Sequence, residues 1–242
     1  MPRRCCGGGR TLPVERKPHG GLPALLIFDF DGVVADSETI ANQALAAYLS
    51  SIGHPTTLDD SMRLFMGKRH ADTLAAIVRY IGRPIPDDFE SAYRAKVRVT
   101  MRANVAPVPG VEDFLGRHRH VPKCVASSSS REWLDHCVDK FGFRPAFGDN
   151  LFSATSVANG KPAPDIYLHA ARTMRAEPTA VVVIEDSPTG VRGGVAAGMK
   201  VIGFLGGSHI RPGHADKLRD AGAHAIAESF DEVETLLLKA GA

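Results

Sequence analysis

The chain has 242 residues, of which 44% are hydrophobic and 23% are charged, and its formal net charge is +2 at pH 7. These values indicate a globular chain with a sizeable core, and the near balance of charge gives no basis for a nucleic-acid or anionic-membrane partner. No apolar run approaches the roughly 20 residues that a membrane-spanning helix needs, so no membrane association is expected. The four cysteines include no CxxC pair, which favours free thiols in a reducing cytoplasm.

Residues 1–23 are predicted to form a flexible N-terminal extension. Basic residues such as Arg3 and Arg4 are followed by glycines at 7–9, and no apolar segment of the kind found in a signal peptide comes after them. We therefore expect a cytoplasmic protein whose folded part begins near residue 24.

Four short apolar runs predict a buried parallel sheet. The first, at 25–28, ends in Asp29-Phe30-Asp31-Gly32, and the others lie at 123–126, 181–184 and 201–204. Helical patterns at 131–141, 164–174 and 187–197 separate the later runs. This alternation predicts right-handed βαβ units, and therefore an α/β fold with a Rossmann-like parallel-sheet core at 24–36 and 108–242.

The glycines of the segment 187–197 do not form a nucleotide-binding fingerprint. Gly190, Gly193, Gly194 and Gly198 lack the GxGxxG spacing, and the helix follows a strand that ends in two acids. Gly198 lies where the helix is expected to stop, and we interpret the glycines of the helix as sites of close packing against the sheet.

Residues 37–107 interrupt the alternation of strands and helices. Apolar residues recur at helical spacing over about 40–49, 62–65, 73–80 and 91–101, and no strand-like pattern appears between them. The sequence thus predicts an all-helical cap domain inserted after the first strand. Two linkers at a sheet edge would let it act as a lid.

Polar side chains follow the predicted strands at the edge where ligands bind in open α/β sheets. They are two carboxylates after the first strand, a hydroxyl after the second, a lysine in a later turn and two acids after the third: Asp29, Asp31, Ser127, Lys161, Glu185 and Asp186. A carboxylate can attack a negatively charged phosphate ester only where cations compensate the charge. Mg²⁺ held by Asp29 and Asp186, together with Lys161, would do so.

The same groups are predicted to have separate roles in the reaction. Asp29 is the predicted nucleophile, which forms an aspartyl-phosphate. Asp31 lies two residues further, on the same side of an extended strand, and is the predicted proton donor and acceptor. Ser127 would hydrogen-bond the phosphate oxygens, whereas Ser128 and Ser129 either contact the substrate or form the turn before the next helix.

Four motifs carry a resemblance to the haloacid dehalogenase superfamily that covers about residues 24–235. In chain order they are Asp29-Phe30-Asp31-Gly32, Val125-Ala126-Ser127, Gly160-Lys161-Pro162 and Ile184-Glu185-Asp186. The inserted helices resemble subfamily I, which has a helical cap. The resemblance implies a phosphatase that acts on a small phosphate ester, with Mg²⁺ as cofactor. The expected metal-site residues are Asp29, Asp31, Glu185 and Asp186, and a direct, water-mediated or orienting role stays open for Glu185.

The resemblance also helps to choose the reaction. Haloacid dehalogenases lack the second aspartate and phosphonatases depart from the DxD pattern, so Asp31 argues against both activities. The chain most resembles sugar-phosphate phosphatases and β-phosphoglucomutases, and the mutases have a histidine where this chain has Ala41. Hydrolysis of a hexose phosphate or 6-phosphogluconate is therefore expected. The protein is separately expected to be a monomer. A phosphosugar mutase and a catalytically idle binding module remain the alternatives.

Residues outside these motifs support weaker expectations. Lys68, Arg69 and His70 match the position of a substrate-specificity loop, although solvated surface charge explains them equally well. His209 and His214 follow the last predicted strand, where they could fringe the site, and a surface position is favoured. Trp133 is expected to pack its helix onto the sheet.

Overall fold

A parallel sheet is the centre of the computed structural model, which describes residues 22–66, 70–85 and 88–239. Within those residues the strands are β1 (Leu25–Phe28), β2 (Lys123–Ser127), β3 (Leu151–Ser153), β4 (Val181–Glu185), β5 (Lys200–Phe204) and β6 (Ala225–Ala227). Their order is β3-β2-β1-β4-β5-β6, and every neighbouring pair is parallel. The order reverses direction at β1, so the crevice beyond the carboxyl ends of β1 and β4 is the expected ligand site.

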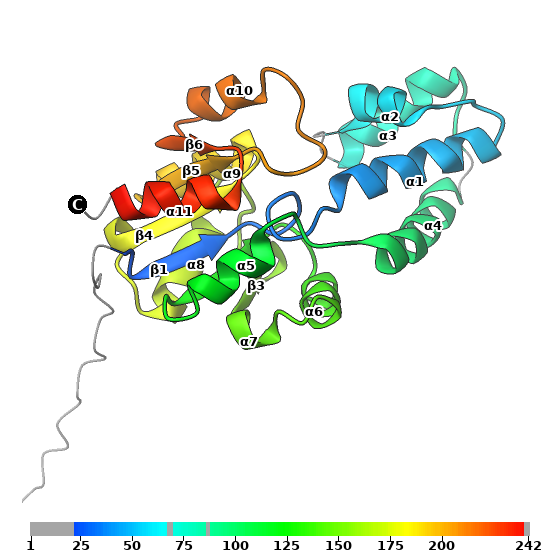
Figure 1. The fold of residues 1–242 in the computed structure, drawn as a ribbon. Coiled ribbons are helices and arrows are strands. Elements are labelled where there is room, and N and C mark those ends of the chain that lie inside the picture. Colours follow the sequence, from blue (N-terminus) through cyan, green and yellow to red (C-terminus); the bar gives the residue numbers. More distant parts are fainter. Residues whose placement is uncertain (1–21, 67–69, 86–87, 240–242) are drawn as a thin grey trace, which may run out of the picture.

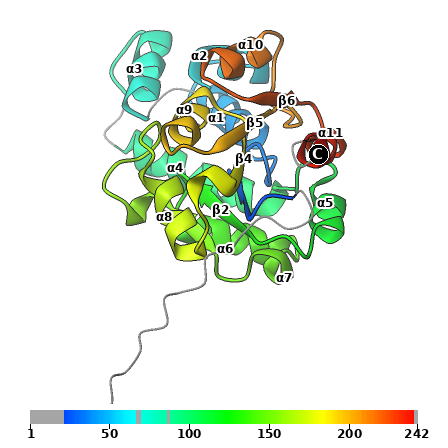
Figure 2. The same cartoon turned by 90° about the vertical axis from the view of Figure 1, so that its left-hand side faces the viewer.

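Helices cover both faces of the sheet, as Figure 2 shows. The helices α5 (Val111–Arg117), α6 (Arg131–Lys140), α7 (Arg144–Phe147) and α11 (Phe230–Lys239) contribute to the core on one face. The helices α8 (Asp165–Met174), α9 (Pro188–Ala196) and α10 (His214–Asp220) contribute to the core on the other. Short 3-10 helices span Ala154–Ser156 and Pro178–Ala180.

The strand β1 shows why its sequence is apolar throughout. Leu26 and Phe28 belong to one core cluster, Leu25 and Ile27 belong to the other, and all four side chains are fully buried. Because successive side chains of a strand point to opposite faces, a strand between two helical layers needs apolar residues at every position.

Four further helices lie between β1 and β2 in the sequence: α1 (Glu38–Ser51), α2 (Leu58–Phe65), α3 (His70–Ile81) and α4 (Phe89–Asn104). We call them the helical unit. Its own core contains Leu45, Leu49, Phe65, Ile77 and Phe89. Figure 1 shows the unit beyond the end of the sheet toward which β1 points. The predicted α/β fold with an inserted set of helices is confirmed, while the exact limits of a cap domain at 37 and 107 stay a prediction.

The expected close packing of α9 is also found. A Cβ atom on Gly190 would lie 1.5 Å from Oε1 of Glu185, and one on Gly194 would lie 2.7 Å from Cγ2 of Val201. Only glycine allows the helix to approach β4 and β5 this closely.

Candidate active site

The ends of β1 and β4 bring three carboxylates together. Asp29 follows β1 and Asp186 follows β4, whose last residue is Glu185. Oxygen atoms of these side chains lie within 4.8 Å of one another, and all three residues are buried. Parallel pairing fixes this proximity, since Phe28 is in register with Ile184 and the Asp29 N–H donates to the Ile184 carbonyl at 2.9 Å.

Lys161 adds a cation to the three carboxylates. Its Nζ donates to Oδ1 of Asp29 at 2.5 Å and to Oε1 of Glu185 at 2.8 Å, and its side chain is 5% exposed. Tyr167 of α8 donates its hydroxyl to Oε1 of Glu185 at 3.1 Å. The lysine therefore lies between the predicted nucleophile and Glu185.

Burial strongly perturbs the titration of these groups. Desolvation raises the pKa of Asp29 well above its ordinary value, Lys161 opposes this, and Glu185 and Asp186 add to the rise. Desolvation also raises the pKa of Asp186, and Glu185 adds to it. Burial alone would lower the pKa of Lys161, but Asp29 and Glu185 outweigh it, so this pKa lies well above its ordinary value. Lys161 thus stays charged, and the raised pKa values of Asp29 and Asp186 reflect that three buried acids share one ammonium.

This donor set fits a hard divalent cation. Buried carboxylate oxygens are the ligands that Mg²⁺ prefers, and a further positive charge would balance the excess of acids over Lys161. Asp29 and Asp186 have the geometry to contact such an ion. Both oxygens of Glu185 already accept hydrogen bonds, since Oε2 receives the N–H and the hydroxyl of Ser187 at 2.7 and 3.0 Å. These bonds favour an orienting role for Glu185.

Asp31 faces a different environment from Asp29. Its Oδ1 accepts hydrogen bonds from the Ser37 hydroxyl at 2.6 Å and the Trp133 indole at 3.0 Å, and its Oδ2 accepts one from the Ser129 hydroxyl at 2.5 Å. Sequence reasoning missed two of these donors. Trp133 packs partly against the core as expected, but its polar edge belongs to the site. A tryptophan on the first turn of α6 has no local sequence signal that points to Asp31.

Two cavities meet at Asp31. The catalytic cavity, of about 500 Å³, is lined by Asp29, Lys161 and Asp186 and by the three serines Ser127, Ser128 and Ser129. The side cavity, of about 370 Å³, lies between α4 and α6. Asp31, Glu38 and Ser129 line both cavities. Ser127 is 1% exposed, and its hydroxyl accepts the Ser129 N–H at 3.0 Å.

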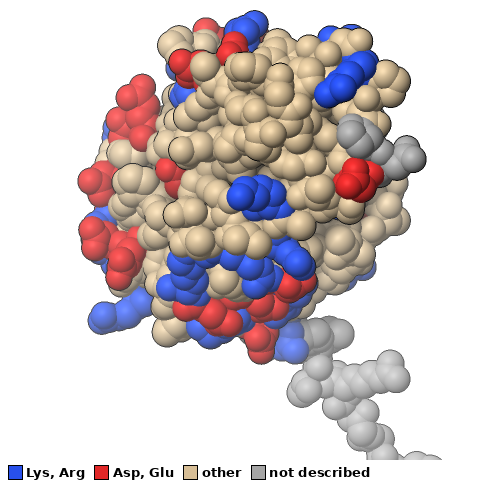
Figure 3. Space-filling model, turned by 90° about the vertical axis from the view of Figure 1, so that its right-hand side faces the viewer, with Lys and Arg blue, Asp and Glu red and all other residues tan. Residues whose placement is uncertain are grey.

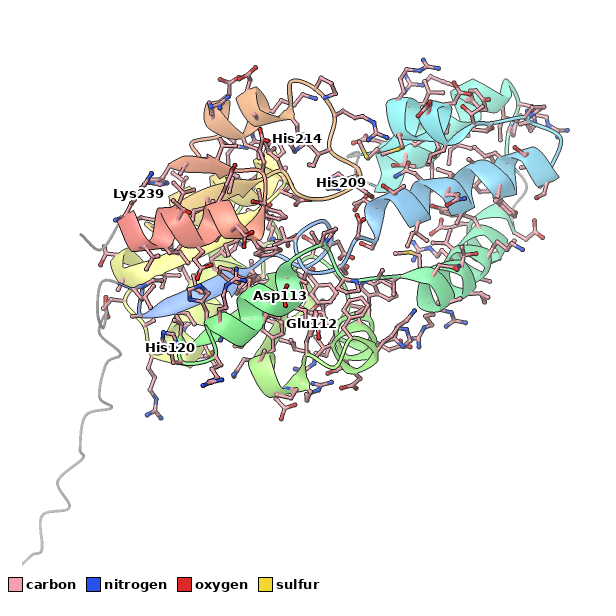
Figure 4. The ribbon with its side chains drawn as sticks, viewed as in Figure 1. Glu112, Asp113, His120, His209, His214 and Lys239 are labelled. Carbon is pink, nitrogen blue, oxygen red and sulfur yellow. The ribbon has the colours of Figure 1, made fainter. Side chains whose placement is uncertain are left out.

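The favoured surface assignment is wrong for His209, and both His209 and the half-buried His214 line the catalytic cavity. His209 is buried, with Nε2 at 3.0 Å from Oδ2 of Asp186, and Nε2 of His214 lies 2.6 Å from the Asp186 carbonyl oxygen. Burial lowers the pKa of His209, against Glu38 and Asp36, which raise it, so the neutral ring can donate to Asp186. Figure 4 shows both histidines on the segment after β5 that runs toward the helical unit, far from His120 and Lys239.

Gly32 leaves the space that the buried contact between His209 and Asp186 needs. A Cβ atom there would lie 1.8 Å from Oδ2 of Asp186 and 2.7 Å from His209, and the glycine has φ +88°. Glycine after the second aspartate is thus required both by the turn and by the carboxylate that packs on it.

The predicted specificity loop lies largely outside the described residues. Lys68 and Arg69 are among the residues that the structure does not describe, and His70 begins α3 with its side chain likewise outside the description. Their role in substrate binding stays a prediction.

Comparisons with known proteins found relatives along most of the chain. The sequence model of the haloacid dehalogenase-like hydrolases matches residues 23–198. The phosphorylated carbohydrates phosphatase of Thermotoga maritima is 31% identical over 87% of this chain and 97% of its own. The 6-phosphogluconate phosphatase of Escherichia coli is 26% identical over 77% of this chain and 85% of its own.

A solved structure of the same family has a similar fold. A haloacid dehalogenase family hydrolase from Deinococcus radiodurans, solved with bound phosphate and sodium, superimposes with a TM-score of 0.79. It is 31% identical, and the match covers 90% of this chain and 96% of the other. The predicted fold, superfamily and phosphatase class are therefore confirmed. With four ordered motifs, the strand-end cluster and a matching family model, this chain belongs to the haloacid dehalogenase-like hydrolases.

Proposed function

We propose that this hydrolase is a Mg²⁺-dependent phosphatase that removes phosphate from a small phosphorylated metabolite of the sugar-phosphate class, through an aspartyl-phosphate at Asp29. The observation that carries the proposal is the buried cluster of Asp29, Lys161, Glu185 and Asp186 at the switch point of the sheet. The named activities of the two relatives above support this substrate class.

In the first step an oxygen of Asp29 attacks phosphorus and the bond from phosphorus to the ester oxygen breaks. Lys161 and the Ser127 hydroxyl compensate charge on the phosphoryl oxygens, which matters most in this buried cavity. The departing oxygen takes a proton from Asp31, whose carboxyl group lies where the two cavities meet.

In the second step water attacks phosphorus of the aspartyl-phosphate and gives its proton to Asp31. The bond from phosphorus to Asp29 breaks, inorganic phosphate leaves and the Asp29 carboxylate is restored. A Mg²⁺ ion bound by Asp29 and Asp186 would supply further positive charge for the phosphoryl group. Glu185 holds Lys161 and the first turn of α9 in place for both steps.

The mutase alternative receives less support. Ala41 lines the side cavity, as Asp31 does, and stands at the position where the resemblance implies a histidine in β-phosphoglucomutases. A methyl group can neither donate to Asp31 nor keep it from activating water. The idle-module alternative conflicts with the complete set of charged groups.

The test is phosphate release from hexose phosphates, 6-phosphogluconate, phosphoglycolate and nucleotides, with Mg²⁺ and with EDTA. Metal-dependent release that disappears in Asp29→Asn, while the thermal unfolding midpoint is retained, is the expected result. Isomerisation of β-glucose 1-phosphate without phosphate release would establish the mutase. No turnover of either kind, and no binding of BeF₃⁻, would refute the phosphatase proposal.

A further inference from the structure

The side cavity lies where the leaving group of a substrate would extend. It shares Asp31, Glu38 and Ser129 with the catalytic cavity, so an ester oxygen that receives the Asp31 proton lies at the junction of the two cavities. The rest of the substrate then extends between α4 and α6, where about 370 Å³ is available. What lines this space decides which leaving groups fit, if the proposed phosphatase function is correct.

The α4 wall of the side cavity carries a row of arginines. Arg94, Arg98 and Arg102 recur every four residues, so they lie on one face of the helix, and all three line the cavity. Like charges at this spacing destabilise a helix, and the stability of α4 alone does not explain them. An apolar row with the same spacing, formed by Tyr93, Val97 and Met101, lines the cavity beside them.

The middle arginine lies between two arginines that have partners. Arg94 bonds Glu90 within α4, and Arg102 bonds Glu132 of α6. Arg98, one turn from each, makes no hydrogen bond or ion pair with any residue that the structure describes, and its side chain is exposed. Figure 3 shows basic and acidic side chains gathered along the lower edge of the face that the helical unit presents, with fewer charges above them.

Charge is distributed unevenly along the side cavity. The acids Asp31 and Glu38 lie at the end shared with the catalytic cavity, and Glu132 is already bonded to Arg102. The row of guanidinium groups is therefore complementary to an anion on the part of the substrate that does not react. Guanidinium groups bind carboxylate and phosphate with the same planar donor geometry.

We propose that the substrate carries a second anionic group, a carboxylate or a further phosphate, and that Arg98, flanked by Arg94 and Arg102, binds it in the side cavity. This proposal rests on the phosphatase function above and makes α4 a specificity determinant. The sequence alone points instead to residues 68–70.

The first test compares esters that differ only at the distal group. One pair is 6-phosphogluconate and sorbitol 6-phosphate, and a second is fructose 1,6-bisphosphate and fructose 6-phosphate. We expect kcat/KM to favour the acidic member of at least one pair by roughly tenfold, the size of a partly solvated charge-assisted hydrogen bond. The pair that shows the preference identifies carboxylate or phosphate.

In Arg98→Gln the preference for the acidic ester should fall to near unity. Lys96→Gln makes the same charge change on an exposed residue of α4 outside the cavity lining, and it should retain the preference.

The second test measures binding without turnover. Trp133 is the single tryptophan of the chain and lines the side cavity, so its fluorescence reports on occupancy. Titration of the Asp29→Asn protein with the same pairs, in Mg²⁺, should give a Kd roughly tenfold lower for the acidic ester. Arg98→Gln in that background should remove the difference.

The outcomes separate this inference from the function it rests on. Hydrolysis of both members of each pair at equal kcat/KM would overturn the inference and leave the phosphatase intact. A preference for acidic esters that survives Arg98→Gln would also overturn it, because the anion would then be bound elsewhere. If no ester is hydrolysed, the phosphatase fails, and the fluorescence titration decides on the anion site by itself.

Discussion

The two cavities that meet at Asp31 are built from different parts of the molecule. In the catalytic cavity, Lys161, Glu185 and Asp186 are almost completely buried and bonded to one another or to neighbouring side chains. In the side cavity, the ion pairs are exposed, since Arg94 with Glu90 and Arg102 with Glu132 lie in contact with solvent. Charges in the first cavity interact at low dielectric and in a fixed geometry, whereas those in the second are screened and can rearrange.

This difference suits two separate tasks. Chemistry needs positive charge held in place before the substrate arrives, and the strand-end acids Asp29 and Glu185 hold Lys161 in this way. Selection needs a surface that can close on a leaving group. The contacts of the helical unit with the rest of the chain include polar ones, such as Arg102 with Glu132 and Arg211 with the sulfur of Met62. We propose that the unit moves as a cap, as the two linkers predict.

The largest expected effect comes from Lys161→Met. This change leaves the Asp29 and Glu185 carboxylates buried without their cation, so kcat should fall about 10²–10³-fold. The free energy of unfolding should fall by roughly 3–5 kcal/mol, measured by denaturant titration.

The control for this prediction is a second buried lysine. Lys123 donates to the carbonyls of His118 and Val121, far from the site. In Lys123→Met the unfolding free energy should fall by about 1–3 kcal/mol, because two carbonyls lose their donor, and kcat should not change. Equal losses of kcat in the two variants would show that Lys161 has no role beyond stability.

His209→Ala should weaken metal binding rather than the chemical step. His209 fixes the orientation of the Asp186 carboxylate through the contact at 3.0 Å, and loss of such a contact lowers metal affinity about tenfold or more. We expect a higher Mg²⁺ concentration at half-maximal activity, with kcat largely restored at saturating Mg²⁺ and affinity partly rescued in His209→Gln. His120→Ala, at an exposed position distant from the site, is the control. An unchanged Mg²⁺ requirement would contradict the assignment.

Trp133→Phe should slow the steps that use Asp31. The phenyl ring retains the packing but loses the N–H that donates to Asp31 at 3.0 Å, so we expect a fall in kcat of about three- to tenfold. Single-turnover hydrolysis of the phosphoenzyme isolates this effect, since the leaving group has already departed. Ser37→Ala removes the second donor to the same oxygen, and the double variant should lose less than the product of the single losses. Independent effects of the two changes would argue against a shared action on Asp31.

The sequence predicts the groups that lie next to regular strands and helices better than those that reach the site across tertiary contacts. Asp29, Lys161 and Asp186 follow or precede regular strands and helices, and register brings them together, so local patterns were sufficient. Trp133 and His209 reach the site across tertiary contacts that no local spacing records. The strands β3 and β6 were missed because each has three residues at a sheet edge and lacks an apolar run long enough to stand out. The helices α5, α7, α10 and α11 were likewise not predicted.

The smallest expected effect tests the side cavity most selectively. Glu132→Gln frees Arg102 and removes an acid from the cavity lining, so the preference for an acidic ester should rise about two- to threefold. The pair is exposed, so the free energy of unfolding should change by less than about 1 kcal/mol. Asp139→Asn is the matched control, because it makes the same charge change on α6 but pairs with Arg144 outside the cavity. A lower preference for acidic esters in Glu132→Gln would mean that Arg102 needs Glu132 to be held in place. In that case the α4–α6 ion pair would be a fixed part of the site, as rigid as the cluster at the strand ends.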